Sequence, residues 1–311
     1  MSKITVIGAA GRVGSNAARE AAGCLKHGDE LVLMDIPLAL NGLRGIAIDI
    51  KDAALTDAMI VATDDRKEIA GADIVVVTAG KPRGPGMTRE QLLLENSSII
   101  KGIGQDIGKY APCAKVIVVS NPMDIMAYVL YKSMGCRPNQ VTGMGGALDS
   151  RRYRKFLAQE FGCKIKDVEG AVVLGAHGEG MVPITSTVRI KGKKPNDMEK
   201  VEEAGKQAVV AGKTMADFGA SAYFGPAPAI NSMVKAILAD TKEVIPSSVL
   251  ASGEFGIKGI FIGLPAKIGK NGVEEIVEIG ITPAEKEKLK DSAKSIRRAM
   301  EPIEGADPNA N

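Results

Sequence analysis

The chain has 311 residues, of which 45% are hydrophobic and 25% are charged; this composition is typical of a globular protein of about two domains and excludes a disordered chain. The net charge is +3, from 40 Lys and Arg against 37 Asp and Glu, which argues against bulk binding to nucleic acid. No apolar run approaches the roughly 18–20 residues of a membrane span, and Arg12, Arg19 and Glu20 interrupt any signal-peptide core.

The first half alternates short β-branched runs with longer helical patterns. Apolar runs without alternation predict strands that are covered on both faces, and the expected strands are residues 3–7, 31–35, 60–63, 73–79, 115–120 and 141–144. An Ala-rich helix is expected over residues 12–24, with further helical stretches between the later strands. This repetition implies βαβ units and a doubly wound parallel sheet of the Rossmann type.

The second half has a different pattern, with mixed strands and charged helices. Helices are expected over residues 149–161, 195–218, 226–239 and 283–300, and strands over 182–190, 243–251 and 259–264. Thr282 and Pro283 are a good N-cap and first helical residue for the last helix. We therefore expect two domains, a Rossmann domain over residues 1–144 and an α+β substrate domain over 145–311.

A glycine-rich turn follows the first strand. It has the spacing G-x-x-G-x-x-G and reads Gly8-Ala9-Ala10-Gly11-Arg12-Val13-Gly14. Glycines there let the main chain approach a pyrophosphate, and the next helix offers its N-terminal N–H groups to the phosphates. The alternative is a tight strand–helix turn of any α/β protein.

Asp35 ends the second strand, 21 residues after Gly14. An acidic side chain at this place binds the ribose hydroxyls of a dinucleotide and repels a 2′-phosphate, which favours NAD over NADP. One alternative is that Arg12 and Arg44 reach a 2′-phosphate and compensate for that repulsion. A solvated aspartate at a strand end is the other.

The chain has two histidines. His27 lies in a Lys-His-Gly-Asp turn and is expected to face solvent. His177 follows the apolar run 171–176 among small residues, and its ordinary pKa of about 6.5 suits proton transfer. In isolation, a structural histidine is an equally good interpretation.

Three further segments carry polar groups where strands end or helices begin. A Gly- and Pro-rich loop over residues 79–89 holds Arg83 and Arg89, whose planar guanidinium groups suit carboxylate recognition. Ser120-Asn121-Pro122-Met123-Asp124 follows a strand, and Leu148-Asp149-Ser150-Arg151-Arg152 begins a helix. Each segment alone has an ordinary alternative: a solvated basic loop, a cap or a surface ion pair.

In this order and spacing, the five motifs resemble the NAD-dependent lactate/malate dehydrogenases, and most closely the lactate-dehydrogenase-like malate dehydrogenases. The resemblance implies that His177 is the catalytic proton acceptor and that Asp149 binds and stabilises it. It also implies that Arg89 reaches the substrate carbonyl when its loop closes.

The resemblance assigns the remaining binding residues as well. Arg152 matches the arginine that grips the substrate C1 carboxylate, and Asn121 matches an asparagine that contacts both substrate and nicotinamide. Asn96 and Val119 match further cofactor-contacting positions. No metal site is expected.

Substrate choice depends on Arg83. Malate dehydrogenases carry Arg at the matching position and lactate dehydrogenases typically carry Gln, because the C4 carboxylate of malate needs a charged partner when it is buried. The expected reaction is therefore the reversible oxidation of (S)-malate to oxaloacetate with NAD. Two alternatives stay open: a lactate or other 2-hydroxyacid dehydrogenase, and a non-catalytic dinucleotide-binding protein.

The resemblance also implies a homodimer or homotetramer and a place in the tricarboxylic acid cycle. The cysteines, which lie far apart and form no C-x-x-C pair, predict reduced thiols in a soluble cytoplasmic protein; they are Cys24, Cys113, Cys136 and Cys163. Neither a membrane nor a nucleic acid is expected as a partner.

Overall fold

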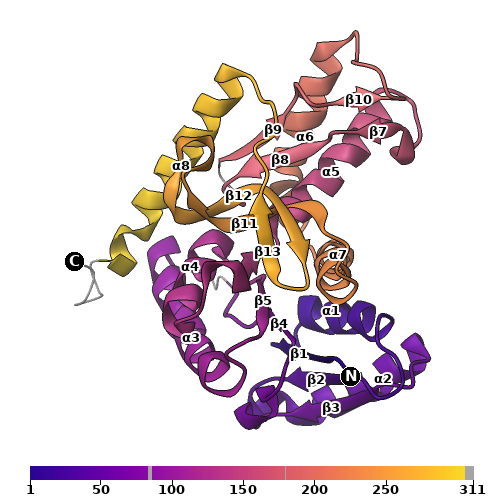
Figure 1. Ribbon diagram of the computed structural model, residues 1–311, viewed down its shortest axis with the longest axis vertical. Coiled ribbons are helices and arrows are strands. Elements are labelled where there is room, and N and C mark those ends of the chain that lie inside the picture. The colour runs from indigo at the N-terminus through magenta and orange to yellow at the C-terminus, as the bar shows by residue number, and fades with distance from the viewer. Residues whose placement is uncertain (83–85, 179, 305–311) are drawn as a thin grey trace.

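The computed structural model describes residues 1–82, 86–178 and 180–304, the side chains of residues 89, 216 and 304 excepted (Figure 1). Its N-terminal half is a sheet of six parallel strands, which confirms the predicted doubly wound arrangement. In spatial order the strands are β3 (Met59–Thr63), β2 (Glu30–Met34), β1 (Lys3–Ile7), β4 (Ile74–Val77), β5 (Lys115–Val118) and β6 (Val141–Gly143).

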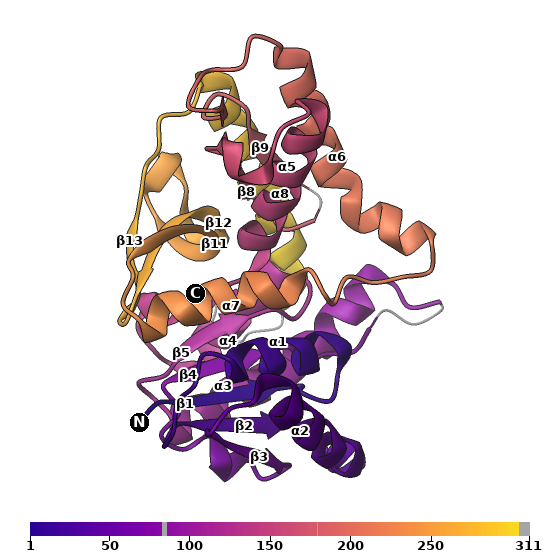
Figure 2. The same ribbon diagram turned by 90° about the vertical axis from the view of Figure 1, so that its right-hand side faces the viewer.

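Helices cover both faces of this sheet (Figures 1 and 2). One group of helices packs together through α1 and consists of α1 (Arg12–Ala22), α2 (Leu40–Ala54) and α7 (Pro226–Leu238). The other group consists of α3 (Arg89–Tyr110), α4 (Met123–Met134) and α8 (Pro283–Glu304). Helices on both faces explain why the strands are apolar throughout rather than alternating.

The sheet continues into the second half of the chain. Strand β11 (Glu243–Ser252) joins β6 through the antiparallel pair Ser248 and Gly143. Beyond β11 the order is β12 (Lys258–Gly269), β8 (Val172–Gly175) and β9 (Met181–Ile184), with β13 (Gly272–Ile276) also on β12. The two halves of the described chain therefore share one hydrogen-bonded sheet.

The remaining elements complete the second half. Helices α5 (Gly145–Glu160) and α6 (Met198–Asp217) pack together, and a small sheet joins β7 (Val168–Glu169) to β10 (Arg189–Ile190). Short 3₁₀ helices lie at Pro37–Ala39, Arg66–Ile69, Pro138–Gln140, Ile165–Asp167 and Glu254–Gly256. Within the described ranges, no helix is both long and apolar enough to cross a bilayer.

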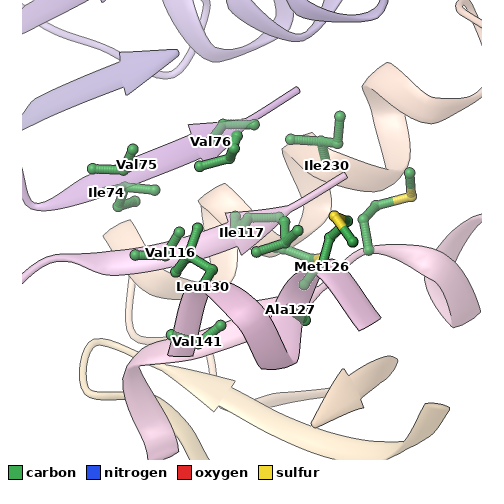
Figure 3. Packing of buried hydrophobic residues seen from close by; sticks show 14 of the residues in the cluster. Ile74, Val75, Val76, Val116, Ile117, Met126, Ala127, Leu130, Val141 and Ile230 are labelled. Atoms are coloured by element: carbon green, nitrogen blue, oxygen red, sulfur yellow. The ribbon is translucent and has the colours of Figure 1, made fainter. Parts of the chain in front are cut away.

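The main core lies between the sheet and its helices. Val76 and Ile117 on the central strands, Met126 and Leu130 on α4, and Ile230 on α7 are all at most 1% exposed (Figure 3). Burial of such side chains contributes about 1.5–3 kcal/mol each. This core fixes the strand ends, from which the polar loops emerge.

Several predicted boundaries differ from the observed ones. Helix α5 begins at Gly145, directly after β6, and not at residue 149. The predicted strand 182–190 is split into β9 and β10, because Glu285 accepts hydrogen bonds from the main-chain N–H groups of Thr185 and Ser186 and holds a turn there. Helix α6 begins at Met198 and not at residue 195, since Asp197 accepts from the Lys200 N–H and acts as its N-cap.

The predicted start of the last helix is confirmed. Thr282 Oγ1 accepts a hydrogen bond from the Glu285 N–H at 3.2 Å, and the Glu285 carboxylate accepts one from the Thr282 N–H at 2.8 Å. This reciprocal pair is a capping box that precedes α8, whose first residue is Pro283.

Candidate active site

The glycine turn after β1 has no room for side chains at two of its positions. Gly8 has φ +86°, and a Cβ there would lie 2.6 Å from the Ala79 nitrogen. A Cβ on Gly14 would lie 2.2 Å from the Gly8 oxygen. Both glycines are therefore required for β1, the turn and α1 to approach one another so closely.

The start of α1 fits a bound dinucleotide. Gly11 is its N-cap and supplies no side-chain cap, and the first turn, Arg12 to Ser15, has no acidic residue. The positive end of this helix is thus free of competing carboxylates on α1 itself, as a pyrophosphate requires. Of the other predicted residues in the turn, Ala9 is buried, Ala10 and Val13 are half-buried, and Arg12 is exposed.

Asp35 lies against this turn, as its predicted role requires. Its Oδ2 accepts a hydrogen bond from the Ala10 N–H at 2.8 Å, and its Oδ1 accepts one from the Ile36 N–H at 2.8 Å. The carboxylate therefore stands where β2 ends, in contact with the glycine turn. Arg12 contacts a distant segment of the chain, with its guanidinium carbon 5.1 Å from the centre of the Tyr223 ring.

Asn96 joins the two loops that follow β4 and β5. It is 2% exposed, and its Oδ1 accepts from the Lys81 N–H at 2.8 Å while its Nδ2 donates to the Asn121 carbonyl at 2.9 Å. The buried amide thus holds these loops together. Val119 is half-buried and Asn121 is exposed, so Asn121 is accessible to a ligand.

His177, Asp149 and Arg152 form one cluster. His177 follows β8, and its Nδ1 lies 2.7 Å from Asp149 Oδ2 on α5. Arg152, one helical turn further, donates from Nη1 to Asp149 Oδ1 at 3.2 Å. The Asp149 side chain is 2% exposed and that of His177 is 19% exposed. Since Asp149 binds Nδ1, proton exchange with a ligand falls to Nε2.

Opposing effects set the protonation of His177. Burial lowers the pKa of His177, but the charge and hydrogen bond of Asp149, together with the charge of Asp124, outweigh burial and raise the pKa above its ordinary value. The positive charge of Arg152 lowers the pKa of His177. A histidine whose charged form is stabilised by a buried carboxylate is suited to accept a proton.

Sequence reasoning gave no role to several residues around His177. Asp124 Oδ2 accepts from the His177 N–H at 2.8 Å, and Ser248 Oγ donates to Asp124 Oδ1 at 2.6 Å. A Cβ on Gly145 would lie 2.7 Å from His177 Cβ, so this glycine lets α5 approach the histidine. Asp124 belongs to a recognised motif, whereas nothing local in the sequence marks Ser248 or Gly145.

The two loop arginines are described only in part. Arg83 lies outside the described residues, and so does the side chain of Arg89. The main chain of Arg89 begins α3, where Thr88 is the N-cap and forms a capping box with Gln91. The described residues contain no group of three or more His, Cys, Asp and Glu side chains that could hold a metal ion.

Two family models match the chain. The lactate/malate dehydrogenase NAD binding domain matches residues 2–143, and the lactate/malate dehydrogenase alpha/beta C-terminal domain matches residues 146–306. Together they cover nearly the whole sequence.

Named relatives agree with this match. A malate dehydrogenase of Bacteroides thetaiotaomicron is 40% identical over 305 residues, covering 95% of this chain and 96% of the relative. The apo malate dehydrogenase of Picrophilus torridus has a TM-score of 0.88 at 38% identity, covering 96% of this chain and 95% of that one. The lactate dehydrogenase of Cryptosporidium parvum, in complex with lactic acid and nicotinamide adenine dinucleotide, has a TM-score of 0.88 at 37% identity, covering 96% of both chains.

Proposed function

This chain belongs to the lactate/malate dehydrogenase family, and from that membership we propose that it interconverts (S)-malate and oxaloacetate. It is an NAD-dependent oxidoreductase whose N-terminal part is an NAD-binding domain. The observation that carries the catalytic part of the proposal is the contact of 2.7 Å between His177 Nδ1 and a buried Asp149 carboxylate. This pair can accept a proton at Nε2 and stabilise the charge that results.

In malate oxidation, NAD held by the glycine turn and Asp35 would supply the acceptor for the C2 hydride. His177 Nε2 accepts the proton of the C2 hydroxyl as the C–H bond breaks and the C2 carbonyl forms. Asp149 holds Nδ1 protonated and stabilises the imidazolium. In the reverse direction, the same imidazolium returns its proton to the carbonyl oxygen.

Arginines recognise the two carboxylates of the substrate. Arg152 binds the C1 carboxylate with its planar fork while Asp149 orients one edge of the guanidinium. Arg83 pairs with the C4 carboxylate, Arg89 polarises the carbonyl, and Asn121 contacts substrate and nicotinamide. The roles of Arg83 and Arg89 rest on their matching positions in the family motifs.

The proposed cofactor residues come from the segments that follow β1, β2 and β5, including the start of α1, and from Asn96 on α3. The glycine turn and the N-terminus of α1 receive the pyrophosphate, and Asp35 receives the ribose hydroxyls. Asn96 and Val119 complete the set, which comprises Gly8, Ala9, Ala10, Gly11, Arg12, Val13, Gly14, Asp35, Asn96, Val119 and Asn121.

We assign the dinucleotide-binding domain to residues 1–144 and the substrate domain to residues 145–311. Assembly as a homodimer or homotetramer is supported by exposed apolar side chains on and beside α2, among them Leu38, Ile48 and Leu55 at 92%, 66% and 90% exposure. Four free thiols support a cytoplasmic setting, where the enzyme serves the tricarboxylic acid cycle.

Steady-state rates with oxaloacetate and with pyruvate, each with NADH and NADPH, test the proposal. We expect a strong preference for oxaloacetate with NADH, and Arg83→Gln should shift that preference toward pyruvate because the C4 carboxylate loses its partner. A wild-type preference for pyruvate would support the alternative of a lactate dehydrogenase. NADH binding without turnover of either substrate would support a non-catalytic dinucleotide-binding protein.

A further inference from the structure

A second buried carboxylate touches His177, and the mechanism above does not use it. Asp124 lies in the first turn of α4 and is 5% exposed. Its Oδ2 accepts from the main-chain N–H of His177 at 2.8 Å, and its Oδ1 accepts from Ser248 Oγ on β11 at 2.6 Å. Asp124 therefore joins α4, the catalytic loop and the sheet of the second half of the chain.

The loop that carries His177 is held at two successive N–H groups. The Ala176 N–H donates to Ser292 Oγ on α8 at 2.8 Å, and the His177 N–H donates to Asp124. These groups come directly after β8, which ends at Gly175. Side chains from two different helices thus replace the sheet partners that a longer strand would have, and they fix the point from which the imidazole projects.

The charges around His177 come from two helices. Asp149 and Arg152 face it from α5 and Asp124 from α4, while β11 contributes the neutral hydroxyl of Ser248. Burial raises the pKa of Asp124 above its ordinary value, although the hydrogen bonds from Ser248 and from the His177 N–H and the charge of His177 stabilise the charged form. Both carboxylate oxygens accept a hydrogen bond, as the ionised form requires. A carboxylate in this position favours a positive imidazole through a medium of low dielectric.

We propose that Asp124 is a positioning residue of the reaction: held by Ser248, its carboxylate fixes the main chain of His177 and supplies a second negative charge for the imidazolium that malate oxidation forms. The proposal rests on the proposed function, because it assigns Asp124 a part in stabilising that imidazolium. Asp124 does not touch the substrate in this role and acts through His177.

The substitution Asp124→Asn removes the charge and keeps the shape. The amide oxygen can still accept from the His177 N–H, and the amide nitrogen can donate to the Ser248 hydroxyl. We expect the acid limb of kcat/KM for malate to move to lower pH by about one unit, because oxidation needs neutral His177 and its pKa falls when a nearby negative charge is lost. The alkaline limb of oxaloacetate reduction, which needs protonated His177, should move down by the same amount.

Two serine variants on β11 sharpen this test. Ser248→Ala keeps the carboxylate but removes its donor, so the acid limb should move in the same direction by a smaller amount. Ser247→Ala is the matched control, because Ser247 is equally buried but its Oγ donates to the main-chain carbonyl of Ile245; its pH profile should match the wild type. If Asp124→Asn fails to fold, a Ser248→Ala profile equal to the wild type overturns the proposal.

Histidine NMR separates this proposal from the proposed function. The chain has two histidines, so an exposed His27 serves as internal reference and His177→Gln assigns the second resonance. A His177 pKa about one unit lower in Asp124→Asn than in the wild type supports the proposal, whether or not malate is the substrate. Unchanged titration and unchanged limbs in an active Asp124→Asn enzyme would overturn the role of Asp124 and leave malate oxidation standing.

Discussion

The glycine turn and the His177 cluster differ in what determines their geometry: close main-chain packing in the first, buried polar side chains in the second. The turn is one continuous segment, and its geometry depends on missing side chains: a Cβ on Gly8 or Gly14 would collide with the main chain. The cluster collects charged and polar side chains from α4, α5 and β11 around one histidine. We therefore expect added side-chain atoms to disrupt the glycine turn, and the loss of a charged group to disrupt the His177 cluster.

The largest effect is expected from His177→Asn, which removes the proposed proton acceptor at the centre of the cluster. General acid–base catalysis contributes about 10²–10⁴-fold, so malate turnover should fall by at least two orders of magnitude. NADH affinity, measured by fluorescence titration, should stay within about threefold of wild type because the glycine turn is untouched. Turnover close to wild type would show that His177 is not the proton acceptor.

Gly14→Ala adds a Cβ to the glycine turn and so tests whether the turn needs a residue without a side chain. The new Cβ would lie 2.2 Å from the Gly8 oxygen, so the turn must change its shape. We expect NADH affinity to fall about tenfold or more and the free energy of unfolding to fall by roughly 1–3 kcal/mol, as for overpacked sites.

Gly45→Ala on α2 is the matched control for Gly14→Ala. A Cβ there meets no atom within 4 Å, and replacing a mid-helix glycine by alanine stabilises by about 0.5–1 kcal/mol. NADH affinity should not change. Equal NADH affinity in Gly14→Ala and in the wild type would contradict the steric account of the turn.

Asp35→Asn tests whether a charge also matters at the glycine turn, because the Asp35 carboxylate binds the Ala10 N–H of that turn. The amide oxygen can replace Oδ2 as acceptor for the Ala10 N–H, so the contact with the turn is kept while the charge and the acceptor for the Ile36 N–H are lost. The ratio of kcat/KM for NADPH to that for NADH should rise about tenfold, since the 2′-phosphate no longer faces a carboxylate. A constant ratio would mean that Asp35 does not discriminate between the two cofactors.

The smallest effect on activity is expected from Glu285→Gln, which changes a buried carboxylate whose hydrogen bonds go to Thr185, Ser186 and Thr282. Burial raises the pKa of Glu285, but hydrogen bonds from Ser186 and Thr282 outweigh it and lower the pKa to about 2. Because this value is below the ordinary 4.5, the carboxylate stabilises the fold above about pH 4.5, and that stability is lost as the pH falls toward 2.

Thermal unfolding as a function of pH measures this contribution. Glu285→Gln should lower Tm at pH 7, and its Tm should converge with that of the wild type near pH 2, while kcat/KM for malate is unchanged. Glu287→Gln, at an exposed position of the same helix, should change Tm little at any pH. A pH-independent loss in Glu285→Gln would point to packing rather than to the carboxylate charge.

The nucleotide half was predictable because its information is local. Six apolar strands, a glycine turn and an acidic strand end all follow from neighbouring residues, and the family models confirm the Rossmann fold. Boundaries set by tertiary partners were not predictable, such as the break between β9 and β10, because its cause is Glu285, about 100 residues further along the chain.

The catalytic half was predictable only in part. His177, Asp149 and Arg152 stand in recognisable motifs, and the structure brings them together. Asp124 lies 53 residues from His177 and 124 residues from Ser248, so its contacts exist only once the strands are assembled. Buried polar partners of this kind leave no periodicity in the sequence.

The pairing of β6 with β11 has a consequence for unfolding. Ser248 pairs with Gly143 across this seam, its carbonyl accepts from Thr142 Oγ1 at 3.2 Å, and its hydroxyl binds Asp124. If the two halves separate at this seam, Ser248 releases Asp124, which binds the main-chain N–H of His177. Amide hydrogens of β6 and β11 should therefore exchange with solvent as one cooperative unit, and heat inactivation should follow their exposure rather than precede it.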